Sequence, residues 1–218
     1  MTSSSQNPQI GIEVKSSATI QNITVKSVGN SYGSDTRAIN LNGNATSVVL
    51  DHVTLESSKA ICVAPGAKTE SLYIKNNSVL TASDDVVNCE ATSAPVVTIE
   101  NSTLNAMKCC GHTASMGPAV YLRGAGTTLY VINSDLYCNS GNISAAIEVA
   151  NNDITVNVDS ESTIKVEGTS SSVNVYAYYV GDKTWNNVIV KRCSITNEAE
   201  VTKHKELDPI IFVKDAEA

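Results

Sequence analysis

Large aromatic side chains are scarce in this sequence. The 218 residues include one Phe, one Trp and eight Tyr, so aromatic residues make up only 5% of the chain. Hydrophobic residues of all kinds nevertheless reach 42%. We therefore expect a core filled mainly by Val, Ile, Leu and Ala, which pack in a narrow interior more easily than large rings do.

A concentration of positive charge is also absent. The net charge is −7 and the 15 basic residues are scattered along the chain. Phosphate binding requires a concentrated Lys/Arg face, so nucleic acid is not expected as a partner. No apolar run reaches the ~18 residues of a membrane span. Residues 2–9 are polar, so no secretory signal follows Met1.

Hydrophobic triplets of the form Φ-x-Φ recur along the chain in two interleaved series, at intervals of 22 to 36 residues. The first series is centred on Ile12, Ile39, Ile61, Val87, Val120, Ile147, Val175 and Ile211, and the second on Ile20, Leu50, Ile74, Ile99, Val131, Val158 and Val190. Such periods mark solenoids, in which each repeat buries its apolar face only by stacking on its neighbours. Alternation within each triplet indicates strands rather than helices.

Each strand of the second series continues through a turn to a third apolar position, as in residues 20–25, 50–55, 99–104 and 131–136. The same frame is predicted for residues 74–79 and 190–195. The corner of these units carries Asn22, Asn76, Asn101 and Asn133, with His52 and Arg192 in two coils. Asn tolerates the left-handed conformation that a sharp corner needs, and stacked Asn amides can hydrogen-bond from coil to coil.

Three short strands per coil, with one corner marked by Asn, are typical of a parallel β-helix. We predict an all-β, single-stranded right-handed parallel β-helix (β-solenoid) of about eight coils, with residues 1–218 in one domain. In this pattern the chain resembles the pectate-lyase-like superfamily over almost its whole length. The end strands of an uncapped solenoid present unpaired backbone groups that can pair with other chains. We therefore expect a segment of a longer exported protein, or capping by neighbouring domains or an oligomer.

The six cysteines show no CxxC pair and no Cys/His spacing typical of zinc sites. We therefore expect no metal and no cofactor. Cys89 falls at an inward position of the repeat and is expected to be a buried thiol. Cys110 and Cys138 lie on adjoining coils and are able to pair if the protein is exported. The sequence leaves their disulfide state open.

One segment resembles the catalytic region of pectate lyases. Asp51 and His52 resemble the Asp-His at the end of a strand in those enzymes. Where the family has acidic calcium ligands, however, residues 59–63 read Lys-Ala-Ile-Cys-Val. Calcium needs six to eight oxygen ligands, so lyase activity is not expected.

A second segment resembles polygalacturonases. Asp84 and Asp85, with His112 27 residues after Asp85, resemble the Gly-Asp-Asp and Gly-His-Gly segments of those enzymes. Polygalacturonases use paired carboxylates as general acid and base. The partner motif expected one coil earlier is replaced by Lys59, and we expect Lys59 to pair with Asp85 instead. Asp84, Asp85 and His112 are therefore candidate catalytic residues only for the alternative function of a polygalacturonase-like hydrolase.

The outward positions of the first series include Tyr121, Glu148, Tyr176 and Phe212. With Arg123 nearby, they are expected to form an exposed amphipathic stripe. Aromatic rings suit the C–H faces of sugars and the polar groups suit their hydroxyls. The candidate glycan-binding residues are therefore Tyr121, Arg123, Glu148 and Tyr176. The alternative is that loops cover the rings or that the rings pack in an oligomer.

These patterns favour a non-catalytic β-helix, extracellular or on the cell surface, that acts as an adhesive or carbohydrate-binding scaffold. The assignment is by analogy, since one fold hosts many functions. An enzyme acting on acidic polysaccharides and a purely structural stalk or spike module are the alternatives that the sequence leaves open.

Overall fold

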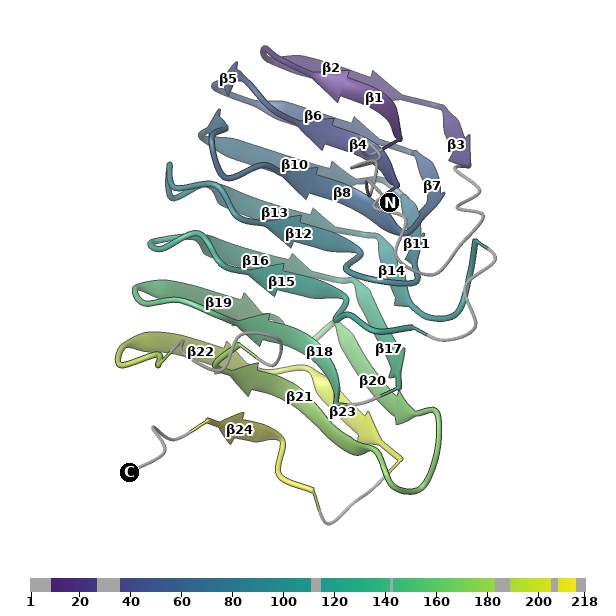
Figure 1. Ribbon diagram of the computed structural model, residues 1–218, viewed down its shortest axis with the longest axis vertical. Coiled ribbons are helices and arrows are strands. Elements are labelled where there is room, and N and C mark those ends of the chain that lie inside the picture. The colour runs from purple at the N-terminus through teal and green to yellow at the C-terminus, as the bar shows by residue number, and fades with distance from the viewer. Residues whose placement is uncertain are drawn as a thin grey trace, which may run out of the picture.

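Three parallel β-sheets run along the length of the molecule (Figure 1). The computed structural model describes residues 9–26, 36–110, 115–141, 143–182, 189–204 and 208–214. All the regular structure in these residues is β-strand, and the strands of successive coils pair in parallel. The fold is therefore a parallel β-solenoid, as the repeat predicted. The described residues contain no helix with the length and apolarity needed to cross a membrane.

Within the described residues the three sheets contain eight, seven and seven strands. Sheet 1 consists of β1 (Ile10–Val14), β4 (Arg37–Leu41), β8 (Lys59–Val63), β12 (Val87–Cys89), β15 (Val120–Leu122), β18 (Ile143–Val149), β21 (Asn174–Val180) and β24 (Ile211–Val213). Sheet 2 consists of β2 (Ala18–Gln21), β6 (Val48–Asp51), β10 (Ser71–Lys75), β13 (Val96–Glu100), β16 (Thr128–Ile132), β19 (Ile154–Val158) and β22 (Cys193–Asn197). Sheet 3 consists of β3 (Thr24–Lys26), β7 (Thr54–Ser57), β11 (Val79–Ala82), β14 (Thr103–Ala106), β17 (Asp135–Ser140), β20 (Thr163–Gly168) and β23 (Glu200–Lys203). The short strands β5 (Asn44–Ala45) and β9 (Lys68–Thr69) pair with each other.

The inward positions of sheet 1 form the apolar column that the triplets predicted. The column includes Ile39, Ile61, Val87, Val120 and Ile147, which follow one another in register and are each 0% exposed. Neighbouring parallel strands lie about 4.8 Å apart, so each side chain packs between its counterparts on the adjacent coils. Together with inward residues of the other two sheets, they belong to one continuous apolar core.

The corner between sheets 2 and 3 has the left-handed backbone that its residues predicted. The φ angle is 54° at Asn22, 53° at His52, 57° at Asn76, 47° at Asn101 and 44° at Asn133. Asn133 also donates a hydrogen bond from Nδ2 to Oδ1 of Asn101 (2.6 Å), which links two coils. The short polar side chain of Asn makes this conformation accessible, so these residues fix where sheet 2 ends.

The predicted frame of sheet 1 is wrong at β21. Tyr178, and not Val175, lies opposite Ile147 in the inward column. Val175 is itself buried, but it lies opposite Ser144, three residues before the position that Tyr178 occupies in the column. The predicted frame is therefore offset by three residues at this strand.

The predicted unit at residues 190–195 is also wrong. Strand β22 begins at Cys193, and Val158 lies opposite Asn197 rather than Val190. Arg192 precedes this strand and does not occupy the corner between sheets 2 and 3. The last coils therefore keep the three-sheet architecture but place different residues in it.

The inward column predicts a sharp contrast between two Val→Asp substitutions. Val120 is fully buried in β15, whereas Val96 in β13 is 40% exposed. Val120→Asp is expected to lower the free energy of unfolding by at least about 3 kcal/mol, because it buries an unpaired charge in a core where each coil depends on its neighbours. Val96→Asp is expected to lower it by less than about 1 kcal/mol. Urea unfolding measures both, and equal losses would contradict the assigned column.

Candidate functional site

A polar pocket of about 170 Å³ lies on the outer face of sheet 1. Its walls come from β8, β12, β15 and β18 and from the segments that flank them. The charged residues that line it are Asp84, Asp85, Glu90, Glu148, Lys59 and Arg123. The other lining residues are Asn88, Met116, Gly117, Pro118 and Tyr121.

The register of sheet 1 brings these side chains together from distant parts of the sequence. Asn88, Tyr121 and Glu148 occupy the same outward position on β12, β15 and β18. Side chains alternate along a strand, so the residue two positions further on lies on the same face. This spacing puts Glu90 beyond Asn88 and Arg123 beyond Tyr121, and both line the pocket.

The turn before β12 carries Asp84 and Asp85 to the pocket. The backbone N–H of Asp84 donates to the carbonyl of Ser58 on the preceding coil (2.8 Å). On the other side, Gly117 packs so closely that a Cβ atom at this position would lie 2.5 Å from Oδ1 of Asp85. The position of the Asp85 carboxyl group therefore depends on glycine at 117.

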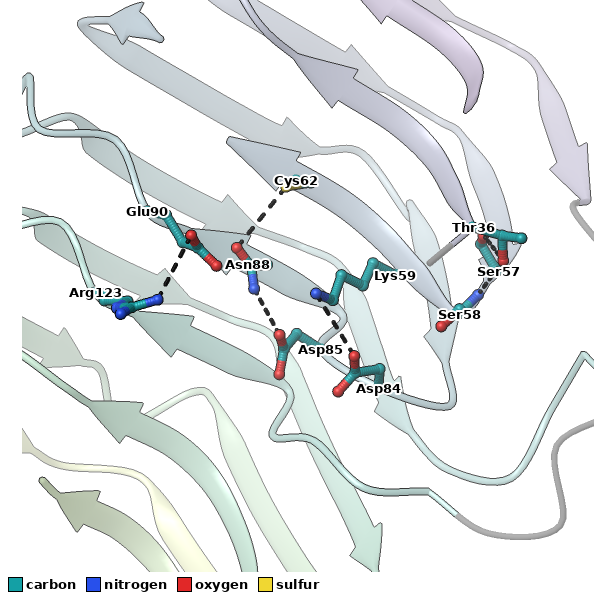
Figure 2. A network of polar contacts seen from close by, with 10 residues as sticks. All are labelled: Thr36, Ser57, Ser58, Lys59, Cys62, Asp84, Asp85, Asn88, Glu90 and Arg123. Atoms are coloured by element: carbon teal, nitrogen blue, oxygen red, sulfur yellow. Dashed lines mark hydrogen bonds and ion pairs between the residues drawn. The ribbon is translucent and has the colours of Figure 1, made fainter. Parts of the chain in front are cut away.

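Two ion pairs cross between coils at the pocket (Figure 2). Lys59 Nζ lies 3.6 Å from Asp84 Oδ2, and Arg123 Nη1 lies 3.8 Å from Glu90 Oε2. The sequence predicts that Lys59 pairs with Asp85. In the structure Lys59 forms an ion pair with the preceding aspartate, while its charge also acts on Asp85 and favours the ionised carboxylate. The Asp85 side chain points toward Asn88 (Figure 2).

Asp85 is the buried acid of the pocket. It is 7% exposed and accepts a hydrogen bond from Nδ2 of Asn88 (2.6 Å). Burial, followed by the charge of Asp84, raises the pKa of Asp85 to about 8. Glu148 acts in the same direction, and Lys59 and Asn88 oppose it. The carboxyl group therefore keeps its proton at neutral pH.

The expected exposed aromatic stripe is not formed. Tyr121 is 8% exposed, Tyr176 6% and Glu148 1%. The hydroxyl of Tyr121 donates a hydrogen bond to Oδ2 of Asp182 (2.8 Å). The residue opposite Glu148 on β21 is Tyr179, so Tyr176 does not belong to the outward column to which it was assigned.

Tyr176 belongs to a separate aromatic cluster. Its ring centre lies 4.9 Å from that of Phe212, and the ring centre of Tyr179 lies 5.2 Å from that of Phe212. The other three candidate glycan-binding residues all line the pocket, whereas Tyr176 does not. Sequence reasoning missed Glu90 as a site residue. Its position two residues after the outward Asn88 would have predicted that it lies on the same face of the sheet.

The remaining predicted features are a histidine and two cysteines. His112, the third candidate catalytic residue, lies outside the described residues. Cys110 and Cys138 are not joined in a disulfide, and Cys138 is buried, with its Sγ atom donating to the carbonyl of Gly117 (3.7 Å). Among the residues that the structure describes, no group of three or more His, Cys, Asp or Glu side chains is arranged to hold a metal ion.

Comparison of the chain with protein-family models, with curated proteins and with solved structures found no match. The β-solenoid is therefore established by the structure itself. A proposal about function rests on the chemistry of the pocket.

The raised pKa of Asp85 predicts a pH dependence of stability. The folded-state value lies above the unfolded-state value of about 4, so between about pH 4 and pH 8 the folded state binds more protons. The free energy of unfolding therefore falls through this window as the pH rises. Asp85→Asn removes this loss, and the variant is expected to gain at least about 1 kcal/mol over the wild type between these pH values. Urea unfolding across the pH range measures the difference.

Asp153→Asn is a control for which the change of stability with pH is expected to have the opposite sign. Asp153 is exposed, and the hydrogen bond from Arg192 lowers the pKa of Asp153. The stability that this pair contributes is present above the unfolded-state pKa and is lost as the pH falls through the folded-state pKa. Asp153→Asn is therefore expected to destabilise slightly at neutral pH. If both substitutions change stability in the same direction with pH, the buried position of Asp85 is wrong.

Proposed function

We propose that the protein is a non-catalytic carbohydrate-binding β-helix and that the pocket on sheet 1 holds one unit of the glycan. The observation that carries the proposal is the gathering of acidic, basic and amide side chains from successive coils in one pocket. Sugar hydroxyls both donate and accept hydrogen bonds, and planar carboxylate, amide and guanidinium groups can engage two of them at once. These side chains hold one another in place, so little conformational entropy is lost on binding.

The partners of the carboxylates favour binding over catalysis. Asp84 is paired with Lys59, and Glu90 is paired with Arg123. A general base must lie within hydrogen-bond reach of the proton that it removes. Carboxylates already engaged with cations are better suited to orient hydroxyl groups than to remove protons.

The size and charge of the pocket favour a neutral sugar. Its volume of about 170 Å³ lies below the roughly 300–1,000 Å³ of pockets that hold drug-sized ligands. It therefore suits a single ring or branch, with the rest of the chain along the outer face of sheet 1. Four acidic residues and two basic ones line it, so the carboxylate of a uronic acid would meet mainly acidic neighbours.

A polysaccharide hydrolase is the second candidate, and the raised pKa of Asp85 favours it. An acid that keeps its proton at neutral pH is able to protonate a leaving group, and further carboxylates line the same pocket. The small exposed fraction of Asp85 argues against it, because a general acid must reach the glycosidic oxygen.

The proposed function places the protein at the cell surface or outside the cell, where polysaccharide ligands occur. It also relates the chain to the pectate-lyase-like superfamily. The support for this relation is the coil pattern with a left-handed Asn corner. The relation is an analogy at the level of the fold.

The proposal predicts that binding depends on the Arg123–Glu90 ion pair of the pocket. Glu90→Gln and Arg123→Ala are each expected to weaken binding to a neutral glycan on the order of tenfold, since each removes a charge-assisted hydrogen bond. The control is Arg192→Ala, which removes an exposed cation that is paired with Asp153 and does not line the pocket. A glycan array selects the ligand, and calorimetry with that glycan measures the affinities. Retained affinity in both pocket variants, or a ligand set restricted to polyuronates, would overturn the proposal.

The hydrolase alternative has a separate readout. Release of reducing ends from polysaccharides is expected to be absent in the wild type. Release that is detected, and that disappears in Asp85→Asn, would replace the binding proposal by the enzymatic one. Release that persists in Asp85→Asn would show that the activity does not depend on this pocket acid.

A further inference from the structure

Two adjacent cysteines after β14 bring their sulfur atoms together. The Sγ atoms of Cys109 and Cys110 lie 3.0 Å apart, and both thiols are free and half-buried. Adjacent side chains in an extended chain point to opposite sides. The backbone at Cys110 has a φ of 57°, in the left-handed region that non-glycine residues seldom adopt. This conformation breaks the alternation and lets the two sulfur atoms meet.

The pair is held against an earlier coil. Cys109 Sγ donates to the backbone carbonyl of Ser57 at the end of β7 (3.5 Å). Strand β7 lies two positions from β14 in sheet 3, so the segment after β14 crosses back over β11. The thiols are therefore fixed by tertiary contacts and not by their sequence neighbours alone.

The two thiols differ in acidity. The hydrogen bond from Cys110 lowers the pKa of Cys109, and the same interaction raises the pKa of Cys110. The charged groups that face the pair are Glu56, which disfavours both thiolates, and Lys26, which favours that of Cys110 and is paired with Glu56 at 3.1 Å. Cys109 is therefore the first thiol to ionise, and the thiolate is the reactive form.

We infer that Cys109 and Cys110 form a reversible redox site that reacts with small disulfides such as glutathione disulfide. The Cys109 thiolate attacks one sulfur of the oxidant, whose S–S bond breaks and releases one thiol. Cys110 then gives up its proton and attacks Sγ of Cys109, which forms the Cys109–Cys110 bond and releases the second thiol. Two electrons pass from the protein sulfurs to the oxidant, and the two protons end on the released thiols.

The product is expected to be easily reduced again. Adjacent Cα atoms lie about 3.8 Å apart, below the roughly 4.4–6.8 Å that most disulfides span. A bond formed outside this range is strained and therefore more reducible. The site would thus respond to the redox balance around it and would not act as a permanent cross-link.

The chain offers a direct readout of the reaction. Trypsin cleaves after Lys108 and Arg123, and residues 109–123 contain no cysteine other than this pair. The folded, reduced protein is equilibrated with mixtures of reduced and oxidised glutathione, quenched with acid, alkylated and digested. We expect this peptide to become unalkylated and two hydrogens lighter as the oxidised fraction rises, and to revert with dithiothreitol. Two alkyl groups at every ratio, or a link to the peptide of Cys138, would overturn the inference.

Two comparisons test whether the fold, and not only the adjacency of the two cysteines in the sequence, makes the pair reactive. A synthetic peptide of residues 109–123 is expected to require about tenfold more oxidised glutathione for half-conversion, since only the folded chain holds the thiols together. Equal midpoints for peptide and protein would contradict the inference. In the folded protein, Cys110→Ser is expected to trap a mixed disulfide on Cys109. Cys193, whose pKa is raised by burial, is expected to be alkylated more slowly than Cys109 at neutral pH, and the reverse order would also count against the site.

Discussion

The parallel register between successive coils is the constraint on which the rest of this structure depends. A single coil has no core of its own, because its three short strands bury their inward side chains only against the coils on either side. Sheet 1 shows the consequence, since Ile61, Val87 and Val120 are fully buried only because they share one position. Moving a strand along by one residue would exchange its inward and outward side chains.

The same register builds the outer face. Outward residues also stack, so polar side chains of successive coils meet side by side instead of being dispersed in solvent. At the pocket, stacking brings Gly117 and Glu148 of later coils to the turn that carries Asp85. Burial, together with the charge of Asp84, raises the pKa of the Asp85 carboxyl group. The chemical character of the site is therefore a result of coil stacking as much as of its individual residues.

Sequence reasoning succeeded where one coil repeats the next. The inward column from Ile39 to Ile147 and the left-handed corner at Asn101 follow from local patterns, period-two alternation and the conformational range of Asn. It failed at β21, where Val175 is buried but lies three residues before Tyr178, the residue that continues the column. Because almost every residue of this strand is buried, the apolar pattern alone does not show which of them continues the column.

The candidate site was predicted in part. Alternation correctly put Tyr121 and Glu148 on the outer face, and the pocket also contains Asp84 and Asp85, which the sequence offered only as candidates for the alternative hydrolase function. The sequence could not show that Tyr121 is covered, because burial of an outward side chain depends on segments that lie far away, such as the one carrying Asp182. Nor does the sequence show that Lys59 pairs with Asp84, since this ion pair depends on the path of the turn before β12.

Disulfide trapping on sheet 2 tests the register most directly. Thr98 and Tyr130 are partners on β13 and β16, whereas Ile132 lies two residues further along β16. Register partners are separated by about 4.8 Å, within the roughly 4.4–6.8 Å window of disulfides. The offset pair is separated by about 8 Å. The account predicts that a Thr98→Cys/Tyr130→Cys variant cross-links under mild oxidation and that a Thr98→Cys/Ile132→Cys variant does not. Cross-linking of the offset pair in preference to the register pair would contradict it.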